Sequence, residues 1–255
     1  MKTVKLIVTD LDGTLLRTDK SVSRRTIQTL ENCRSEGIKL AFATGRTASA
    51  LSLAPMELFD GHAVANGAVA TIGDTVVHRR LIPWEDARPF LVACHERGLH
   101  ISSQLGGEDY SNFVMSDVWP EVTYFTIVDF KTHALDADKI ITYNLTHEDI
   151  DFIQKKLPPH SYMVMAVDGL AMITHVQAKK SYAINALCRH WGISPTETVA
   201  FGDDLNDIDM LECAGTGVAM GNALNEVKQA ADDICKTNDE DGLAIWIEEN
   251  ILHRR

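Results

Sequence analysis

The sequence predicts an α/β fold, in which a Rossmann-like parallel sheet has helices on both faces and a separate α+β domain is inserted into it. Apolar strand-like runs alternate with helical segments towards both ends of the chain, and short joints connect them. Between residues 83 and 177 the pattern changes to helices followed by pairs of short strands. A chain of 255 residues is long enough for a core and an inserted domain.

The first 82 residues show the strand, helix, strand order of right-handed parallel crossovers. Residues 4–10 form a nearly continuous apolar run, which is typical of a strand with both faces covered. Ser23 is a suitable N-cap for the helix that follows, and Gly37 is a stop signal. The elements expected here are strands at 4–10, 38–44, 63–70 and 76–77, helices at 23–33 and 47–58, and a hairpin at Gly73-Asp74.

Residues 83–177 are predicted to form the inserted α+β domain, because a helix followed by paired strands occurs there twice. The first helix ends at Gly98 and the second at Pro158-Pro159. Tyr110 and the turn Asp168-Gly169 are candidate substrate contacts in this domain. The expected elements are helices at 84–97 and 147–157 and strands at 99–103, 110–115, 122–128, 162–167 and 170–175.

The alternating pattern returns after residue 178. The expected elements are helices at 180–191, after Asn206, at 223–231 and at 243–252, with strands at 198–201, at 217–220 and near 234. Residues 1–82 and 178–255 are therefore predicted to form one discontinuous catalytic core, with residues 83–177 inserted into it.

The composition limits the classes of partner. A net charge of −12 argues against a nucleic-acid partner, which calls for a basic patch. The same charge repels phosphate, so a phosphate site would need a metal ion, a few cationic side chains or helix N-termini. We expect no membrane partner, because no apolar run approaches the roughly 20 residues of a spanning helix. Five scattered cysteines without a CxxC pair, and an N-terminus without signal-peptide features, favour a cytoplasmic protein.

Three of the predicted parallel strands end in polar clusters, and ligands bind beyond the carboxyl ends of such strands. The clusters are Asp10-Leu11-Asp12, Thr44-Gly45-Arg46 and Asp203-Asp204-Leu205-Asn206-Asp207. We therefore expect them to converge in one crevice, although they lie far apart in the sequence.

The expected crevice would hold the carboxylates of Asp10, Asp12, Asp203 and Asp207, which repel one another unless a cation lies between them. Mg²⁺ suits such a site, because it binds a few carboxylates together with phosphate oxygens. Asp10 could then attack phosphorus as a covalent nucleophile, and Asp12 could serve as general acid and then general base.

The phosphoryl oxygens of a substrate would also need hydrogen-bond donors and positive charge. The Thr44 hydroxyl and the Gly45 N–H suit this need. Lys179 and Lys180 stand at the start of a helix, where the helix dipole disfavours a cation unless it reaches an anion site.

With these motifs in place, the chain resembles the haloacid dehalogenase superfamily of phosphatases, in particular the Cof-like branch with a large inserted α+β cap. The matching segments are Asp10-Leu11-Asp12-Gly13-Thr14-Leu15, Ala43-Thr44-Gly45-Arg46, Asn66-Gly67-Ala68, Lys180, Gly202-Asp203-Asp204-Leu205-Asn206-Asp207 and Gly217-Val218-Ala219-Met220-Gly221-Asn222-Ala223. Family members usually have Gly after the motif lysine, where this chain has Ser181. Lys180 matches better than Lys179, because Ala183 and Leu187 then fall at the expected offsets.

The resemblance implies roles for individual residues. Asp10 would be the nucleophile and Asp12 the general acid and base. The Mg²⁺ ligands would be the Asp10 carboxylate, the Asp12 carbonyl and Asp203, with Asp207 in support. Substrate phosphate would be held by Thr44, Gly45, Lys180 and Asn206, and Arg46 lies in the same substrate-binding motif.

The function expected from these residues is Mg²⁺-dependent hydrolysis of small phosphorylated metabolites, such as sugar phosphates or pyridoxal phosphate, through an aspartyl-phosphate. A phosphotransferase or phosphomutase with the same nucleophile is the alternative, and the sequence does not separate the two. A receiver-like signalling domain also gathers acidic residues, Mg²⁺ and a lysine, but the inserted domain and Asp12 argue against it. The oligomeric state is left open.

Overall fold

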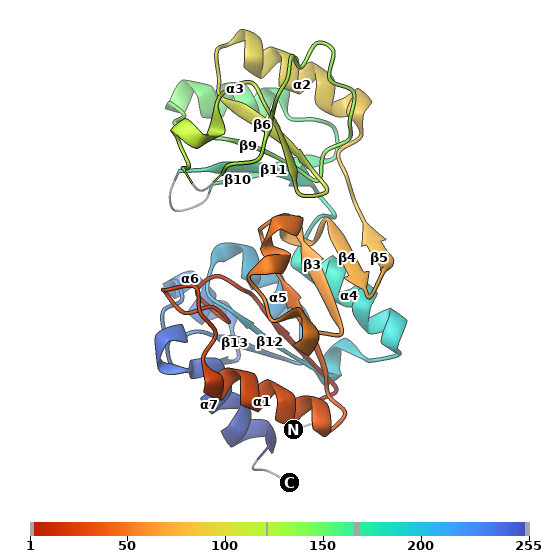
Figure 1. Cartoon of the computed structure of the whole chain (residues 1–255), viewed down its shortest axis with the longest axis vertical. Coiled ribbons are helices and arrows are strands. Elements are labelled where there is room, and N and C mark those ends of the chain that lie inside the picture. The colour runs from red at the N-terminus through yellow and green to blue at the C-terminus, as the bar shows by residue number, and fades with distance from the viewer. Residues whose placement is uncertain (1–2, 121, 166–168, 253–255) are drawn as a thin grey trace. The chain divides into compact units, whose positions relative to one another are not determined.

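The computed structural model describes residues 3–120, 122–165 and 169–252. The chain divides into two compact units, which are coloured along the sequence in Figure 1. We call Met1–Arg79 together with Lys179–Arg255 the discontinuous unit, and Arg80–Ala178 the inserted unit.

The discontinuous unit is built on an eight-stranded sheet in the order β14-β13-β12-β1-β2-β3-β4-β5. The strands from β14 to β3 are parallel to their neighbours, and β4 and β5 add an antiparallel hairpin at one edge. The strands are β1 Leu6–Thr9, β2 Lys39–Ala43, β3 Gly61–Val64, β4 Val69–Ile72, β5 Thr75–Arg79, β12 Thr198–Gly202, β13 Thr216–Ala219 and β14 Asp233–Ile234.

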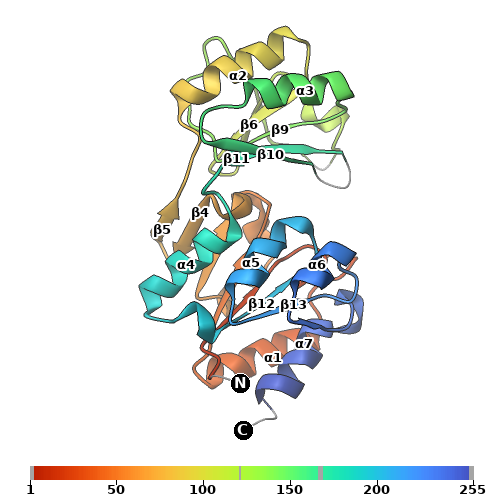
Figure 2. The ribbon, with the colours of Figure 1, turned by 180° about the vertical axis from the view of Figure 1, so that it is seen from behind.

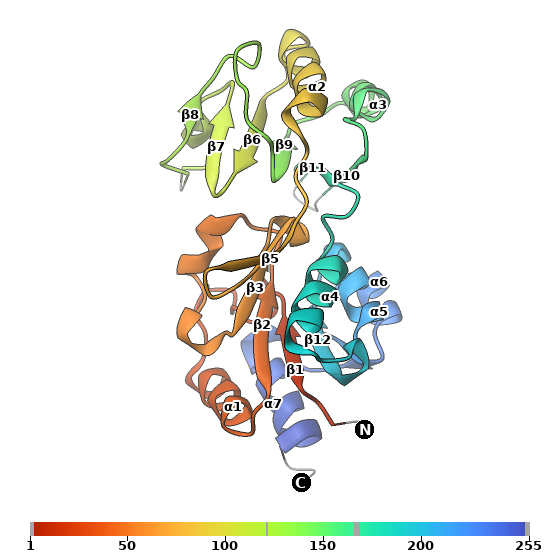
Figure 3. The same cartoon turned by 90° about the vertical axis from the view of Figure 1, so that its right-hand side faces the viewer.

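Helices cover both faces of this sheet, with α1 and α7 on one side and α4, α5 and α6 on the other (Figure 3). Figure 2 shows the second face from the front. The helices are α1 Arg24–Ser35, α4 Lys180–Trp191, α5 Ile208–Cys213, α6 Asn225–Ala230 and α7 Gly242–Ile247, which continues as a π-helical turn over Glu248–Leu252. The predicted α/β fold with a parallel sheet between two helical layers is confirmed.

Local signals set the bounds of these elements. The Ser23 side chain accepts a hydrogen bond from the Thr26 N–H and caps α1, as expected. All four residues of β1 are buried, because β12 and β2 flank it in register and helices cover both faces. Gly192 ends α4 with a left-handed φ of 66°.

Two expectations for this unit are wrong. The helix expected at 47–58 is replaced by two 3₁₀ turns, Ala48–Ser52 and Met56–Leu58, because Pro55 between them lacks an N–H and disfavours helical backbone before it. The single strand expected at 63–70 is two strands, β3 and β4, separated by a 3₁₀ turn over Ala65–Gly67. The backbone reverses there through positive φ angles at Ala65 and Asn66.

The inserted unit has a six-stranded sheet in the order β10-β11-β9-β6-β7-β8, in which all neighbours are antiparallel except β7 and β8. Its elements are α2 Trp84–Glu96, β6 Ile101–Leu105, β7 Glu108–Ser111, β8 Thr126–Ile127, β9 Lys139–Thr142, α3 His147–Lys156, β10 Ser161–Met165 and β11 Ala171–His175. Helices α2 and α3 are each followed by an antiparallel pair, as the repeated pattern predicts.

Strand β9 was not predicted from the sequence, although β9 lies between β6 and β11 near the middle of this sheet. The strand has only four residues and follows the polar Asp136-Ala137-Asp138 segment, so the Ile140-Ile141 pair was its main signal. Tyr110 lies in β7, and its hydroxyl donates to Glu108 at 2.7 Å. Asp168 and the end of the strand expected at 162–167 lie outside the described residues.

Each unit has its own apolar core. The inserted unit packs α2 and α3 onto one face of its sheet through residues that include Phe90, Leu91, Ile101, Ile140 and Ile153. None of the helices within the described residues has the length and apolar character needed to cross a membrane. The five cysteines are free thiols, and three of them are buried.

Candidate active site

The three polar clusters meet at the carboxyl ends of the parallel strands, as the sequence predicts. Asp10 follows β1, Thr44 follows β2 and Asp203 follows β12, and β1 lies between the other two strands. The chain order reverses direction at β1, which is the position where open α/β sheets bind their ligands. The Asp10 N–H donates to the Phe201 carbonyl at 2.9 Å and extends the β1–β12 pairing to the site.

Lys180 is the centre of a buried charge cluster. Its Nζ donates to Asp10 Oδ1 at 2.7 Å and to Asp207 Oδ1 at 2.5 Å. Lys180 is 1% exposed and Asp207 is fully buried. Burial alone lowers the pKa of Lys180, but the two carboxylates outweigh it and raise that pKa above its usual value. Lys180 therefore remains an ammonium in the cluster.

The backbone of the loop after β12 fixes Asp207. Its Oδ2 accepts from the N–H groups of Asp203 at 3.0 Å and Asp204 at 3.1 Å. A Cβ at Gly202 would lie 2.5 Å from the Asp207 Cβ, so this close approach requires glycine. Because both Asp207 oxygens already accept hydrogen bonds from the protein, Asp207 orients the cluster.

Asp203 lies against the loop that follows β1. Its Oδ1 accepts from the Thr14 hydroxyl at 2.7 Å. Gly13 has φ +76°, and a Cβ there would lie 2.3 Å from Asp203 Oδ2. Burial raises the pKa of Asp203 to about 7. Burial also raises the pKa of Asp10 well above its usual value, and the Lys180 ammonium opposes this rise only in part.

These carboxylates suit a hard dication. Asp10, Asp203 and Asp207 each offer an oxygen, and these oxygens lie within 4.8 Å of one another. Three carboxylates against the single Lys180 ammonium leave two negative charges, which Mg²⁺ would balance. Since Asp207 is engaged by Lys180 and by backbone N–H groups, Asp10 and Asp203 are the carboxylates best placed to bind the ion.

Asp12 has a different environment from Asp10, although only Leu11 separates them. Its Oδ2 accepts from Arg46 Nε at 2.5 Å, and its Oδ1 accepts from Arg46 Nη2 at 2.9 Å and from Lys20 Nζ at 2.8 Å. The Asp12 side chain is 33% exposed. Partial burial raises the pKa of Asp12, but the hydrogen bonds from Arg46 and Lys20 outweigh it and bring the pKa below its usual value.

A second turn approaches the loop after β2. Asn206 Nδ2 donates to Asn66 Oδ1 at 2.9 Å. A Cβ at Gly45 would lie 2.9 Å from Asn66 Oδ1 and 3.2 Å from Asn206 Nδ2, so Gly45 leaves room for both amides. The Asn66 N–H donates to the Thr44 carbonyl at 3.0 Å. The structure thus brings Thr44, Gly45 and Asn206 together around Asn66.

Sequence reasoning did not assign roles to two residues of this region. Asn66 belongs to a segment that carries the family resemblance, but no role was assigned to it. It lies in an Asn-Gly pair within an expected strand, and such a pair is itself a signal for a turn. Lys20 follows Thr18-Asp19 in a polar loop and has no sequence signal that separates it from a surface lysine. Arg46 was expected at the phosphate, and its guanidinium contacts Asp12 in this structure.

A comparison with protein families decides the affiliation of the chain. The sequence model of the family described as haloacid dehalogenase-like hydrolase matches residues 7–247. The chain belongs to this family. The match spans the acidic loop after β1, the loop after β2 and the loop after β12, so it covers the whole constellation described above.

Relatives of this haloacid dehalogenase-like protein are phosphatases by name. A putative phosphatase of Haemophilus influenzae is 30% identical over 96% of this chain and 97% of its own length. The 5-amino-6-(5-phospho-D-ribitylamino)uracil phosphatase of Bacillus subtilis is 30% identical over 96% of both chains. A solved structure of a subclass IIB sugar phosphatase superposes with a TM-score of 0.85 at 27% identity, over 96% of this chain and 98% of that one.

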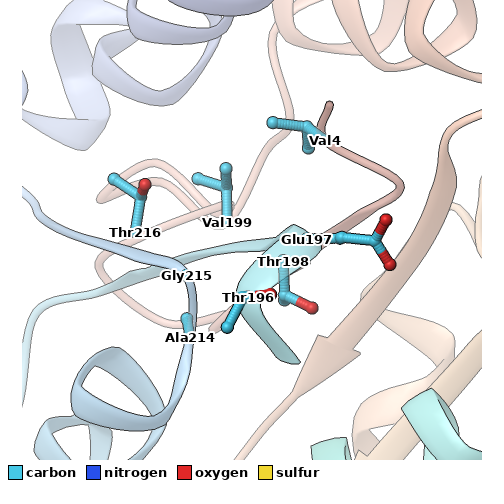
Figure 4. Close-up of a pocket in the computed structure, with 8 residues that line it drawn as sticks. All are labelled: Val4, Thr196, Glu197, Thr198, Val199, Ala214, Gly215 and Thr216. Atoms are coloured by element: carbon cyan, nitrogen blue, oxygen red, sulfur yellow. The ribbon is translucent and has the colours of Figure 1, made fainter. Parts of the chain in front are cut away.

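The discontinuous unit also has a hollow of about 400 Å³, at the amino ends of the parallel strands of its sheet (Figure 4). It lies where β12 and β13 begin, whereas the acidic cluster lies where β12 ends. Glu197 is the charged residue in its lining, and this carboxylate pairs with Lys5 at 2.8 Å. The hollow is therefore separate from the acidic site.

Proposed function

We propose that this chain is a Mg²⁺-dependent phosphatase of small phosphorylated metabolites and that Asp10 is its covalent nucleophile. The observation that supports this most is the contrast between two carboxylates at the end of β1. Asp10 is buried against Lys180, whereas Asp12 is partly exposed and held by Arg46 and Lys20. Two carboxyl groups in such different environments suit different roles in one reaction.

In the first half-reaction, an Asp10 carboxylate oxygen forms a bond to phosphorus while the bond from phosphorus to the leaving oxygen breaks. The protonated form of Asp12, which the hydrogen bonds from Arg46 and Lys20 disfavour in the free site, donates its proton to the leaving oxygen, which departs as an alcohol. The Thr44 hydroxyl, the Gly45 N–H, the Lys180 ammonium and the Asn206 amide donate to the phosphoryl oxygens. Asn66 holds the Asn206 amide through its own Oδ1.

In the second half-reaction, Asp12 is the general base. It takes a proton from water, the water oxygen bonds to phosphorus, and the bond from phosphorus to Asp10 breaks. This step releases inorganic phosphate and restores the Asp10 carboxylate. Mg²⁺ bound by Asp10, the Asp12 carbonyl and Asp203 would supply positive charge for the phosphoryl oxygens, with Asp207 orienting the site.

The substrate class rests on the relatives and on the division of the chain. The B. subtilis relative and the structural neighbour are named for a phosphorylated metabolite and for sugar phosphates, respectively. We therefore propose sugar phosphates as substrates, and we keep pyridoxal phosphate as a proposal from the sequence. We also propose that residues 1–82 and 178–255 form the catalytic core and that residues 83–177 select the substrate. Exchange of Arg80–Ala178 for the corresponding segment of a relative should then change the substrate profile.

We propose a cytoplasmic location as well. Its support is the set of five free cysteines, which a reducing compartment keeps as thiols. Burial raises the pKa of Cys33 and of Cys94 to about 12, so both are unreactive core thiols.

The Asp10→Asn variant tests the mechanism, with Asp74→Asn in the exposed β4–β5 turn as the matched control. Phosphate release is measured with Mg²⁺ over a panel of phosphate esters. We expect kcat to fall by at least about 10³-fold in Asp10→Asn, since the nucleophile is lost, and to stay unchanged in the control. Rapid-quench mass spectrometry should find a phosphoryl group on Asp10 in the wild-type protein. Full activity of Asp10→Asn would refute the proposal.

A further inference from the structure

The helix that carries Lys180 begins with a residue that cannot cap it. Helix α4 starts at Lys180, and Lys179 stands at the N-cap position with extended backbone. The first N–H groups of a helix have no acceptor within the helix and are usually satisfied by an oxygen of the N-cap side chain. A lysine ammonium has no acceptor atom. The N–H of Ser181, the second residue of α4, therefore needs an acceptor from another segment.

Asp209 supplies this acceptor from helix α5. Its Oδ2 accepts a hydrogen bond from the Ser181 N–H at 2.9 Å, across 28 residues of sequence. A carboxylate at this end of a helix also interacts favourably with the helix dipole, and a hydrogen bond to an ionised acceptor is stronger than one between neutral groups. Asp209 thus replaces the missing cap of α4.

Two contacts consequently join the starts of α4 and α5. One is the ion pair between Lys180 Nζ and Asp207 Oδ1, and the other is the hydrogen bond between the Ser181 N–H and Asp209. The ion pair holds the end of the lysine side chain, whereas the hydrogen bond holds the backbone from which that side chain extends. Because the stem of a lysine is flexible, a fixed backbone limits the positions that its ammonium can reach.

The 3₁₀ turn Ala65–Gly67 also packs closely against this backbone. A Cβ at Gly67 would lie 2.3 Å from the Lys179 carbonyl oxygen and 2.9 Å from the Lys180 nitrogen. The start of α4 therefore has no room to move towards this turn. The hydrogen bond to Asp209 adds a directed attachment to that close packing.

We propose that Asp209 is a positioning residue, which holds the start of α4 and so keeps the Lys180 ammonium at the nucleophile. This inference rests on the proposed function, in which Lys180 donates to the phosphoryl oxygens. Lys180 Nζ lies 2.7 Å from Asp10 Oδ1, so displacement of its backbone would weaken its contact with the group that reacts. Donors of this kind bind the developing charge of the transition state more strongly than the ground state. Loss of Asp209 should therefore lower kcat more than it raises KM.

The variants Asp209→Ala, Asp209→Asn and Glu212→Ala test this inference beside the wild-type protein. Asp209→Ala removes the acceptor, whereas Asp209→Asn keeps an oxygen that can accept the same hydrogen bond. Glu212 is the control, because it is an exposed carboxylate three residues later in the same helix. Values of kcat and KM are measured with 4-nitrophenyl phosphate and Mg²⁺. Orthovanadate is the inhibitor, because its five-coordinate form resembles the transition state of phosphoryl transfer.

We expect kcat of Asp209→Ala to fall by about 10- to 100-fold and KM to stay within about twofold, since a misplacement of about 1 Å costs up to about 100-fold in rate. The Ki of vanadate should rise by the same factor as kcat falls. Asp209→Asn should keep most of the activity, and Glu212→Ala should match the wild type.

The Ki of vanadate separates a positioning role from a merely structural one. A partly unfolded sample contains fewer active molecules, which lowers the apparent kcat but leaves the Ki of the folded molecules unchanged. Urea unfolding establishes that each variant is folded at the assay temperature. If Asp209→Ala is not folded, Asp209→Ser takes its place, because serine is too short to reach the Ser181 N–H but is well tolerated near the start of a helix.

The inference is wrong if Asp209→Ala keeps the kcat of the wild type, or if its kcat falls while the Ki of vanadate stays the same. A loss in Asp209→Asn or Glu212→Ala as large as that in Asp209→Ala would also contradict it, because charge on α5 would then be responsible instead of the hydrogen bond. All these results leave the phosphatase function intact. If the wild-type protein with Mg²⁺ hydrolysed no phosphate ester, the proposed function itself would be refuted, and this inference with it.

Discussion

The two units of the chain use ionised side chains in different ways. The discontinuous unit buries the Lys180 ammonium between Asp10 and Asp207 at one edge of a parallel sheet. The ion pair of Arg97 with Asp149 in the inserted unit is partly exposed, with side-chain exposures of 34% and 15%. Parallel neighbours end at the same edge, so their polar ends collect there, whereas antiparallel neighbours end at opposite edges. Strand direction thus determines where charge can be concentrated.

The same contrast is seen in two aspartates whose pKa values move in opposite directions. Burial raises the pKa of Asp203 in the discontinuous unit to about 7. Hydrogen bonds from Thr146 and Arg97 lower the pKa of Asp149 in the inserted unit to about 2. Ionisation of Asp203 is therefore unfavourable, and a bound cation would favour it. Ionised Asp149 instead stabilises the N-terminus of α3.

Removal of the buried cation should have the largest effect on stability. Lys180→Met leaves Asp10 and Asp207 buried without their partner, and breaking such a pair costs about 3–5 kcal/mol. Urea unfolding at pH 8 in metal-free buffer measures this free energy. Lys39→Met, which breaks an exposed pair, should cost less than about 1 kcal/mol. Equal losses in the free energy of unfolding of the two variants would contradict the difference between the buried and the exposed ion pairs.

Mg²⁺ should stabilise the protein in a pH-dependent way. The pKa of Asp203 is about 7 in the folded chain and about 4 in the unfolded one, so its contribution to stability is fully present below pH 4 and is lost as pH rises through 7. Mg²⁺ replaces the bound proton, and at a hundred times its Kd it should add about 2.7 kcal/mol. The gain in Tm should therefore be larger at pH 8 than at pH 5.

The Asp203→Asn variant is the control for that measurement. It removes the titrating carboxyl group and a metal ligand, so its Tm should respond little to Mg²⁺ at either pH. Calorimetric titration at pH 6 in two buffers of different ionisation enthalpy should also show proton release on Mg²⁺ binding in the wild-type protein. An equal Tm gain at pH 5 and pH 8 would rule out this role of Asp203.

The smallest expected effect is in the inserted unit. Thr146 and Asp149 form a capping box at the start of α3, and Thr146→Ala should cost about 1 kcal/mol of stability. The lowered pKa of Asp149 means that its contribution is present above about pH 4 and is lost as pH falls towards 2. Amide hydrogen exchange in α3 measures both effects.

Thr146→Ser keeps the capping hydroxyl and is the matched control for Thr146→Ala. Exchange in α4 of the discontinuous unit should be unchanged in both variants, because the cap acts within α3. If α3 lost protection as pH rose instead of fell, the assignment of Asp149 as an ionised cap would be wrong.

The convergence of the polar strand ends could be predicted from the sequence because the relevant signals are local. A buried apolar strand that ends in Asp10-Leu11-Asp12, another that ends in Thr44 and a third that ends in Asp203 are each visible within a few residues. Topology then brings parallel strand ends together without any knowledge of side-chain contacts. The α/β fold and the convergence of these clusters followed from this reasoning.

Elements without a strong local pattern were missed. The four residues of β9 are a strand because β6 and β11 pair with them on both sides. The turn at Asn66 interrupts an apolar run that reads as one strand, and its positive φ is supported by the hydrogen bond from the Asn66 N–H to Thr44. In both cases residues far away in the sequence decide the local conformation.

The sequence by itself determined the alternation of strands and helices and the residues at the strand ends, since both depend on hydrophobic periodicity and on near neighbours. The tertiary structure decided which partner each charged group has. It gave Asp10 and Asp207 the buried Lys180, and it gave Asp12 the exposed Arg46 and Lys20. These pairings depend on burial and on distances between segments up to 170 residues apart, and burial and partner together set the charge state of each carboxylate.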